Sequence, residues 1–314
     1  MADSNLRAKR TRVNGRSELG QAAVLSVVWM VVLLGLAGLV IGVGAWYRSQ
    51  RNQQAQADAA ALAGAQDLPD NTSAASSAAQ VYATKNGYTL PISGISFSST
   101  VAPDDSITVK VDHDAPTFFS KIFGLQSVPV HVEATAQTSL IGRARYVAPI
   151  AVNIKHPLLS GPGCPCFGQQ TTLPLSKTGA PGAFALIDLD NGTGNGSSTL
   201  GNWVLNGFAA YLGLGPYSSN TGAKFNSTDI DNALDARIGT VLMFPVYDTI
   251  VMQGTNAVYN VIGWVGFLLG GYKITGGNSG SLTGSFTEIT WQGIPATQGN
   301  GPPNLGARVV TLTR

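Results

Sequence analysis

The chain has 314 residues, of which only 11% are charged, and its 38 glycines and 16 prolines favour a body rich in strands and loops over a helical one. The net charge is +2; five basic residues and two acids in residues 1–20 contribute +3, which leaves −1 for the rest. A body this neutral lacks the basic surface that nucleic-acid binding requires, so this class of partner is excluded.

An uncharged, apolar segment follows the basic tail of residues 1–20. No charged residue occurs from Leu19 to Tyr47, and residues 21–47 are long enough for one transmembrane helix. A cleaved secretory signal has a shorter apolar region, and a buried core helix rarely runs this far without a charge. Only Arg48 and Arg51 follow the span closely. The positive-inside rule therefore predicts a single-pass membrane protein with a cytoplasmic N-terminus and residues 48–314 outside the cytoplasm.

Residues 48–68 are rich in Ala and Gln and hold no proline, so we expect the anchor helix to extend through them. Ala55, Ala59, Leu62 and Ala63 recur there at helical spacing. A narrow stripe of small side chains suits close helix packing, either on another envelope protein or on a second copy of this chain. The alternative is a rigid alanine-rich stalk.

Three motifs give this N-terminal region a recognisable family character. Residues 17–68 carry Gly-Gln-Ala before the span, Val-Gly-Ala-Trp-Tyr at its exit, and the run Asp-Ala-Ala-Ala-Leu-Ala-Gly-Ala from Asp58 to Ala65. In these features the segment resembles TadG-like proteins of the Tad (Flp) pilus-assembly system. The resemblance implies an envelope role with pilus-assembly partners. The family commonly has an acid late in the span, where this chain has Gly42, so any contact made by that acid is in question here.

Residues 70–141 predict a small α+β module. Ala75, Ala78, Ala79 and Tyr82 mark a helix that Asn86-Gly87 ends. Short strands are expected at Ile95–Phe97 and Ile107–Val111, and a long one at Val128–Ala136. Asp114 is placed as the N-cap of a short helix ending at Gly124. The resemblance implies such a module after the anchor.

Residues 145–314 predict a mainly antiparallel β domain with small helices, so the overall fold class is α+β. Helices are expected at Leu200–Leu212 and Asp229–Ile238. The apolar run Val258–Tyr272 is too short for a second span and is interpreted as a buried strand. The other expected strands are Phe184–Leu189, Val241–Tyr247, Thr249–Met252, Thr283–Trp291 and Val309–Leu312.

Cys164 and Cys166 are the only cysteines. Outside the cytoplasm oxidation is the default, and a bridge between them closes a small strained ring. Two free thiols, intermolecular pairing, and a redox or metal role stay open as alternatives. Zinc would need two more ligands, and His113, His131 and His156 are not clustered with the pair in the sequence.

Two further patterns are weak. Asp188–Gly196 has oxygen-bearing side chains at alternate positions, but a full calcium loop needs Glu where Thr199 stands. Gly277–Gly280 resembles the serine segment of trypsin-like proteases, yet no matching histidine segment precedes it. We therefore predict no catalytic residue, no cofactor and no metal site.

The sequence thus supports a non-catalytic structural or assembly component of a Tad-type pilus, in contact with the bilayer and with other pilus-assembly or envelope proteins. The alternative is a membrane-anchored surface-binding module, for glycan or protein, that is unrelated to piliation. An extracytoplasmic enzyme would need a catalytic constellation that the residues do not offer.

Overall fold

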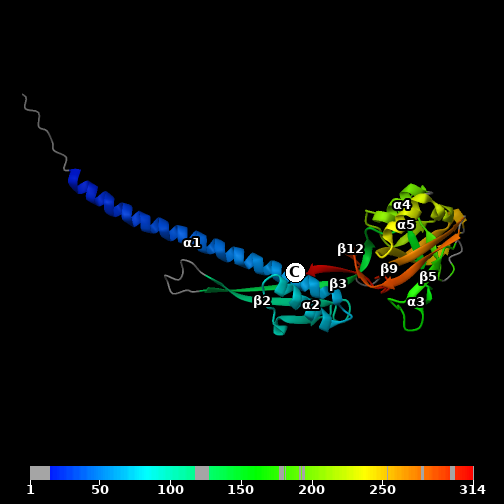
Figure 1. The fold of residues 1–314 in the computed structure, drawn as a ribbon. Helices are drawn as coiled ribbons and strands as arrows, with labels where there is room; N and C mark the ends of the chain where they lie inside the picture. Colours follow the sequence, from blue (N-terminus) through cyan, green and yellow to red (C-terminus); the bar gives the residue numbers. More distant parts are fainter. Residues whose placement is uncertain are drawn as a thin grey trace, which may run out of the picture. The chain divides into compact units, whose positions relative to one another are not determined.

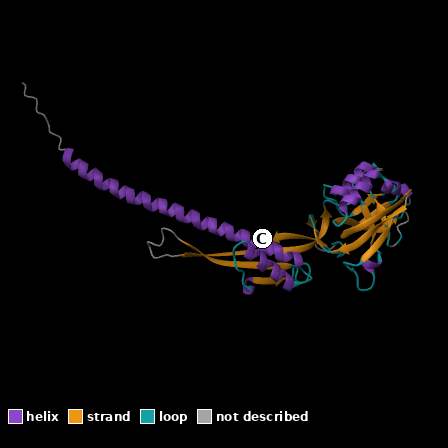
Figure 2. Ribbon diagram, in the orientation of Figure 1, coloured by secondary structure: helices purple, strands orange, loops and turns teal. Residues whose placement is uncertain are grey.

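The computed structural model describes residues 15–116, 127–176, 180, 182–190, 192, 195–252, 254–276, 279–297 and 301–313. They divide into two compact units. One holds the described residues up to Ala57 and those between Lys110 and Glu133. The other holds Asp58–Val109 and the described residues from Ala134 onward. Figure 1 labels the elements along the chain, and Figure 2 separates helices from strands.

The N-terminal helix is continuous, as the sequence predicts. Helix α1 spans Gly15–Gly64 as 50 residues without a break, and the 3-10 turn η1 (Ala65–Asp67) follows it. The expected span at 21–47 and the expected extension from residue 48 are therefore one helix. The described residues contain one helix that is long and apolar enough to cross a membrane.

Helix α2 (Thr72–Lys85) and the 3-10 turn η2 (Ile92–Gly94) follow the anchor helix. The Asn71 side chain accepts the Ala74 N–H at 2.9 Å and so caps the first turn of α2. Its buried residues are Ala75, Ala79 and Ala83, whereas Tyr82, expected on this face, is 44% exposed. The helical spacing of α2 was predicted correctly, but its buried face is rotated by part of a turn from the predicted one.

Six strands form the first sheet among the described residues, in the order β1-β2-β3-β13-β11, with β12 also paired to β3. Alternate side chains of β2 and β3 are buried, which is the pattern of a half-buried strand. The bounds are β1 Ile95–Ser98, β2 Ser106–Pro116, β3 Ser127–Ala144, β11 Ile289–Thr290, β12 Gly293–Pro295 and β13 Ala307–Thr313.

The helix predicted from Asp114 is wrong at its start, because Asp114 lies within β2. Pairs across to β3 explain this. Lys110 lies 3.5 Å from Glu133, and the Asp112 carboxylate lies 2.6 Å from His131 Nδ1, so cross-strand contacts continue beyond Val111. The rest of that predicted helix, residues 117–124, lies outside the described residues.

The chain leaves the first sheet after β3 and returns to it near its end. Strand β13 pairs antiparallel with β3, with Arg308 opposite Leu140 and Thr313 opposite Thr135. Strands β11 and β12 also join this sheet. Residues 145–288 are therefore inserted in the chain between β3 and β11, two strands of the same sheet. The predicted boundary at 141–145 does not take account of this return.

A second, seven-stranded sheet is built by the described residues of that inserted stretch, in the order β5-β10-β9-β8-β4-β6, with β7 also on β9. All its pairs are antiparallel except β4 with β8. This confirms the α+β class with a mainly antiparallel domain. The bounds are β4 Ile150–Asn153, β5 Gln170–Pro174, β6 Phe184–Leu186, β7 Gly215–Ser218, β8 Val241–Val251, β9 Val258–Gly276 and β10 Ser279–Thr287.

Aromatic rings form the centre of this domain. Phe244 and Phe267 stack with centroids 5.1 Å apart, and Phe286 meets Phe267 edge-on at 5.4 Å. Strand β9 is the buried strand predicted for Val258–Tyr272. The two strands predicted at 241–252 are the single strand β8, which carries register shifts around Tyr247.

Two helices of the domain pack against each other, as Figures 1 and 2 show. Helix α4 spans Ser197–Asn206 and α5 spans Thr228–Arg237. Gly201 permits their close approach, since a Cβ there would lie 2.7 Å from the Asp229 carbonyl oxygen. The prediction for α4 ran to Leu212, but the helix ends before Gly207, whose φ of +73° favours glycine. The described part of the domain also contains the short helical turns α3 (Pro157–Ser160), η4 (Gly222–Asn226) and η5 (Gly254–Asn256).

Candidate functional site

The apolar part of α1 buries almost none of its side chains within the chain. Leu33 is 61% exposed, Leu39 is 64% exposed, and Trp29 is 64% exposed. An unbroken surface of this length has no counterpart on a water-soluble monomer, where large apolar patches mark contact with a membrane or another protein. The segment is also long enough to cross the bilayer hydrocarbon. The helix is therefore the clearest functional surface that the described residues present.

The C-terminal part of α1 packs within the chain through a face that the sequence did not single out. Ala57, Ala60 and Ala61 are each at most 1% exposed, and Ala65 is fully buried. Ala55, Ala59 and Leu62 lie on the opposite side of the helix, where they are exposed or half-buried. Of the predicted stripe, only Ala63 is buried, at 4% exposed. The structure thus separates a face that packs within the chain from one that does not.

Small side chains on the buried face let this helix lie close to its neighbours. A Cβ on Gly64 would come within 2.6 Å of Ile107 Cδ1 in β2 and within 2.8 Å of the Ala75 carbonyl oxygen in α2. Any larger residue would force these elements apart. The Asp58–Ala65 run, which carries the family resemblance, therefore has a packing reason: it joins the anchor helix to the first sheet.

Arg308 of β13 holds the end of the anchor helix to the last strand. Its side chain donates to the Leu68 carbonyl oxygen at 2.9 Å and forms a two-pronged ion pair with Asp70. The Arg308 side chain is 11% exposed and the Asp70 side chain is 51% exposed. Bidentate guanidinium–carboxylate pairs fix geometry as well as charge. The sequence offered no signal for this contact.

Asp105 organises the turn between β1 and β2. It is 1% exposed and accepts the backbone N–H groups of Thr100, Val101 and Ala102 at 2.7 to 2.9 Å. Burial alone raises the pKa of this carboxyl, but the three backbone donors and the Thr100 hydroxyl outweigh it and hold the pKa well below its usual value. Asp105 is therefore an ionised structural acid whose lone pairs are used within the chain.

A cavity of about 270 Å³ lies beside these groups, lined by Leu140 and Val101 among others. Asp105 and Arg308 reach its wall, yet both are engaged by protein partners. Most of the lining is apolar. The cavity therefore offers no acid–base pair and no free charge for chemistry.

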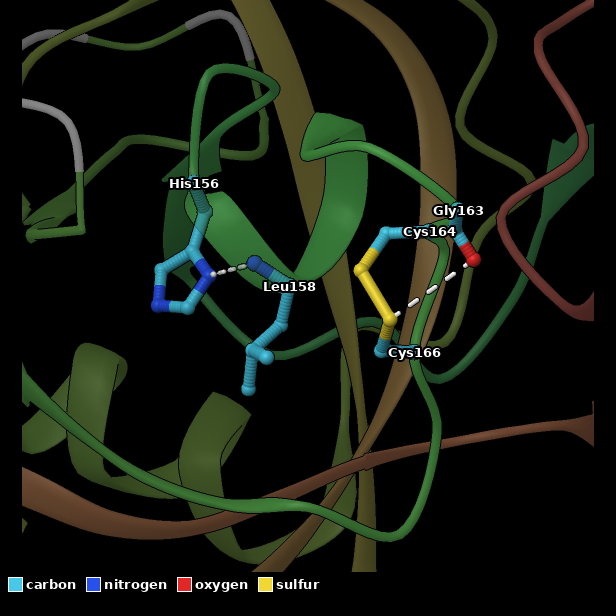
Figure 3. The surroundings of a disulfide bond; sticks show 5 residues. All are labelled: His156, Leu158, Gly163, Cys164 and Cys166. Atoms are coloured by element: carbon cyan, nitrogen blue, oxygen red, sulfur yellow. Dashed lines mark hydrogen bonds between the residues drawn. A yellow bond between two sulfur atoms is a disulfide. The ribbon is translucent and has the colours of Figure 1, made fainter.

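The two cysteines are bonded to each other in the structure, as Figure 3 shows. They lie in the loop after α3, and Cys166 N–H donates to the Leu158 carbonyl oxygen at 2.8 Å. His156 precedes α3, is 3% exposed, and accepts the Leu158 N–H on Nδ1 at 3.1 Å. Burial lowers the pKa of His156, which favours the neutral ring. This histidine therefore caps a helix and lacks the exposure of a catalytic base.

The acidic side chains of the Asp188–Gly196 segment make hydrogen bonds within the chain. Asp188 is fully buried and accepts from Asn220, while Asp190 accepts the Gly192 N–H at 2.9 Å and the Asn195 amide at 2.8 Å. Within the described part of the chain, no three His, Cys, Asp or Glu side chains are grouped to hold a metal ion. Ser279 and Gly280 lie in β10, and the two residues before them lie outside the described residues.

Comparison with protein families matches the N-terminal region. A family described as Flp pilus-assembly TadE/G-like matches residues 20–67, and a family described as Tad-like Flp pilus-assembly matches residues 63–136. The first match covers most of α1, and the second covers α2 and strands β1, β2 and part of β3. No curated protein and no solved structure matches the chain.

Proposed function

We propose that this chain is a non-catalytic component that anchors part of the pilus machinery in the bacterial envelope, because its residues 20–136 match family models of TadE/G-like and Tad-like Flp pilus-assembly proteins. The observation that carries the proposal is the exposed apolar helix, which leads without a break into the family's folded module. The helix anchors, and the sheets behind it contact pilus or envelope proteins. No step of this role needs catalysis.

The anchor lies with its N-terminus in the cytoplasm and residues 48–314 outside. The charge balance supports this orientation, since five basic residues precede the span and only Arg48 and Arg51 follow it closely. The division into a module at 70–141 and a domain at 145–314 belongs to the same proposal, with β11 to β13 completing the first sheet.

The stripe of Ala55, Ala59 and Leu62 is the part of the helix that docks to a partner helix. Small side chains let two helix backbones approach closely, and this side of α1 is less buried within the chain than the side of Ala57 and Ala61, since Ala55 is exposed and Ala59 and Leu62 are half-buried. Ala63 belongs to the internal contact instead, because it is buried.

Deletion of the gene and rescue by variants test the proposal. We expect deletion to abolish piliation and the wild-type chain to restore it. Ala55→Glu places a charge on the docking stripe and should reduce both piliation and co-purification of pilus proteins, at an unchanged membrane level of the chain. Gln50→Glu adds the same charge at an exposed position about 140° around the helix and should have no effect.

Protease treatment of spheroplasts tests the orientation. Added protease should degrade residues 48–314 and leave a membrane-embedded N-terminal fragment. Full piliation in the deletion strain would overturn the assembly role, and protection of the C-terminal domain in intact spheroplasts would overturn the orientation.

A further inference from the structure

A second cavity, distinct from the anchor, lies in the inserted domain where α4 ends. It has a volume of about 240 Å³ and is walled by three aromatic side chains, Tyr146, Trp203 and Trp291, together with Arg237. Trp203 comes from α4, Arg237 from the end of α5, and Trp291 follows β11. Nothing in the anchor or the first sheet accounts for a pocket of this composition.

Arg237 brings a positive charge into the wall without a counter-ion. No carboxylate among the described residues lies within ion-pair distance of it, and its two terminal nitrogens donate only to the backbone, to Leu205 O at 3.1 Å and Val241 O at 2.7 Å. Its Nε–H is buried and meets no acceptor. Arg237 is half-buried, and this partial burial lowers the pKa of its guanidinium. A bound anion would give the charge a partner.

Next to the cavity residue Tyr146 in the chain, Arg145 lies against two aromatic rings. The Arg145 guanidinium lies 5.0 Å from the Tyr146 ring centroid and 5.1 Å from the Tyr211 ring centroid, and its Nε donates to Ala209 O at 2.7 Å. Arg145 makes no ion pair with the described residues either. Among the described residues that wall the cavity, Arg237 carries the charge, and an unpaired guanidinium beside aromatic walls attracts anions.

The aromatic walls are fixed in place by the backbone. Trp291 Nε1 donates to the Arg145 carbonyl oxygen at 2.7 Å, and Trp203 meets Phe208 edge-on at 5.2 Å. Tyr146 has a φ of +54°, which is rare for an aromatic residue, and Gly207 makes room for it: a Cβ on Gly207 would lie 2.4 Å from Tyr146 Cα. Strained backbone of this kind clusters at binding sites.

We propose that this cavity binds one acidic sugar ring, a uronic-acid unit of a surface or wall polysaccharide. The carboxylate meets the free N–H groups of Arg237, and the ring lies against the faces of Trp291 and Tyr146. Planar guanidinium groups match carboxylates, and the volume is below the range of about 300–1000 Å³ typical of drug-sized ligands, which suits a single ring. This inference goes beyond the pilus-assembly role and does not depend on it.

Titration of the full-length chain in detergent micelles tests the proposal, with calorimetry and tryptophan fluorescence as readouts. Glucuronate or galacturonate should bind and quench fluorescence, and glucose should bind at least about tenfold more weakly because it lacks the carboxylate. N-acetylglutamate, a carboxylate without a sugar ring, should also bind more weakly. A polyuronate fragment should bind no worse than the monosaccharide if the pocket takes a unit of a polymer.

Variants assign the binding to this cavity. Arg237→Gln should weaken glucuronate binding about tenfold or more, and Trp291→Phe should weaken it about threefold to tenfold. Lys273→Gln is the matched control, since it removes a positive charge from an exposed position of β9 outside the cavity. If Arg237→Gln fails to fold by circular dichroism, Trp291→Phe carries the test.

Four results would overturn the proposal. These are no binding of either uronate at millimolar concentrations, equal binding of glucose, equal binding of N-acetylglutamate, or unchanged affinity in the folded cavity variants. Uronate binding and piliation are separate measurements, so a failure of the sugar-binding proposal can be told apart from a failure of the assembly role.

Discussion

Replacing Arg308 with Met should loosen the last strand from the sheet behind the anchor. Methionine keeps much of the apolar stem and removes the guanidinium, so the change isolates the polar contacts. The hydrogen bond from a charged donor to the buried Leu68 carbonyl contributes about 1.5–3 kcal/mol. The ion pair with Asp70 adds at most about 1 kcal/mol, because half of the Asp70 side chain is exposed and water screens it.

The expected loss is therefore about 2–3 kcal/mol of local opening free energy, which corresponds to about 30- to 160-fold faster amide exchange in β13. Hydrogen–deuterium exchange with mass spectrometry on the full-length chain measures this directly for the peptide covering residues 307–313. Asp70→Asn is the control. It removes the carboxylate charge and leaves Arg308 bonded to Leu68, so exchange should quicken less than about fivefold. Unchanged β13 exchange in Arg308→Met would refute the reasoning that this arginine fastens the strand.

Three further outcomes follow from the described contacts. Burial lowers the folded-state pKa of His156, so its contribution to stability is complete above pH 6.5 and declines by at most about 1.4 kcal/mol per pH unit as the pH falls. Thermal melts at pH 7.5 and 5.5 should show this loss of stability. The variant His156→Asn, which keeps an acceptor for the helix cap, should show a smaller loss. Despite burial, the backbone donors lower the folded-state pKa of Asp105, so its contribution to stability is present above the unfolded-state pKa of 3.8 and is lost as the pH falls below it. Asp105→Asn should cost about 2–3 kcal/mol at neutral pH, seen as faster amide exchange in the β1–β2 turn. Unchanged exchange in that turn would contradict the structural role of this carboxylate. The Cys164–Cys166 bond closes only a very small loop, so reducing it should lower the free energy of unfolding by less than about 2 kcal/mol. A Cys164→Ser, Cys166→Ser double variant that melts far lower would show that the bridge does more than close this loop.

Local periodicity predicted most elements of this chain because each carries its own burial pattern. The alternation Val128–Ala136 indicated a strand, and β3 contains it; the uncharged run from Leu19 indicated the helix, and α1 contains it. Pairing could not be predicted in the same way. The segment Val309–Leu312 is an alternating strand with many equivalent partners, and nothing local specifies β3 across more than 160 residues.

The buried face of α1 was missed for a different reason. In an alanine-rich helix almost every side is small and weakly apolar, so a stripe through Ala55 and Ala59 is hardly distinguishable from one through Ala57 and Ala61. The elements that pack against the helix determine which face is buried. Gly64 lies on that face, where a Cβ would come within 2.6 Å of Ile107 Cδ1. A glycine within such a run is a better guide to the packed side than the alanines around it.

The return of the chain to the first sheet changes what the family match means. The matched region ends at residue 136, but its sheet is complete only with β13, which pairs with β3 from Thr135 to Leu140. Without β13 that stretch of β3 would be an open edge, the kind of surface that invites wrong pairing. Two chain connections therefore join the inserted domain to the first sheet, one leaving β3 and one leading to β11, which pairs with β13. The chain reaches β13 only after the inserted domain, so this sheet is completed last, as would not be the case for two domains in tandem.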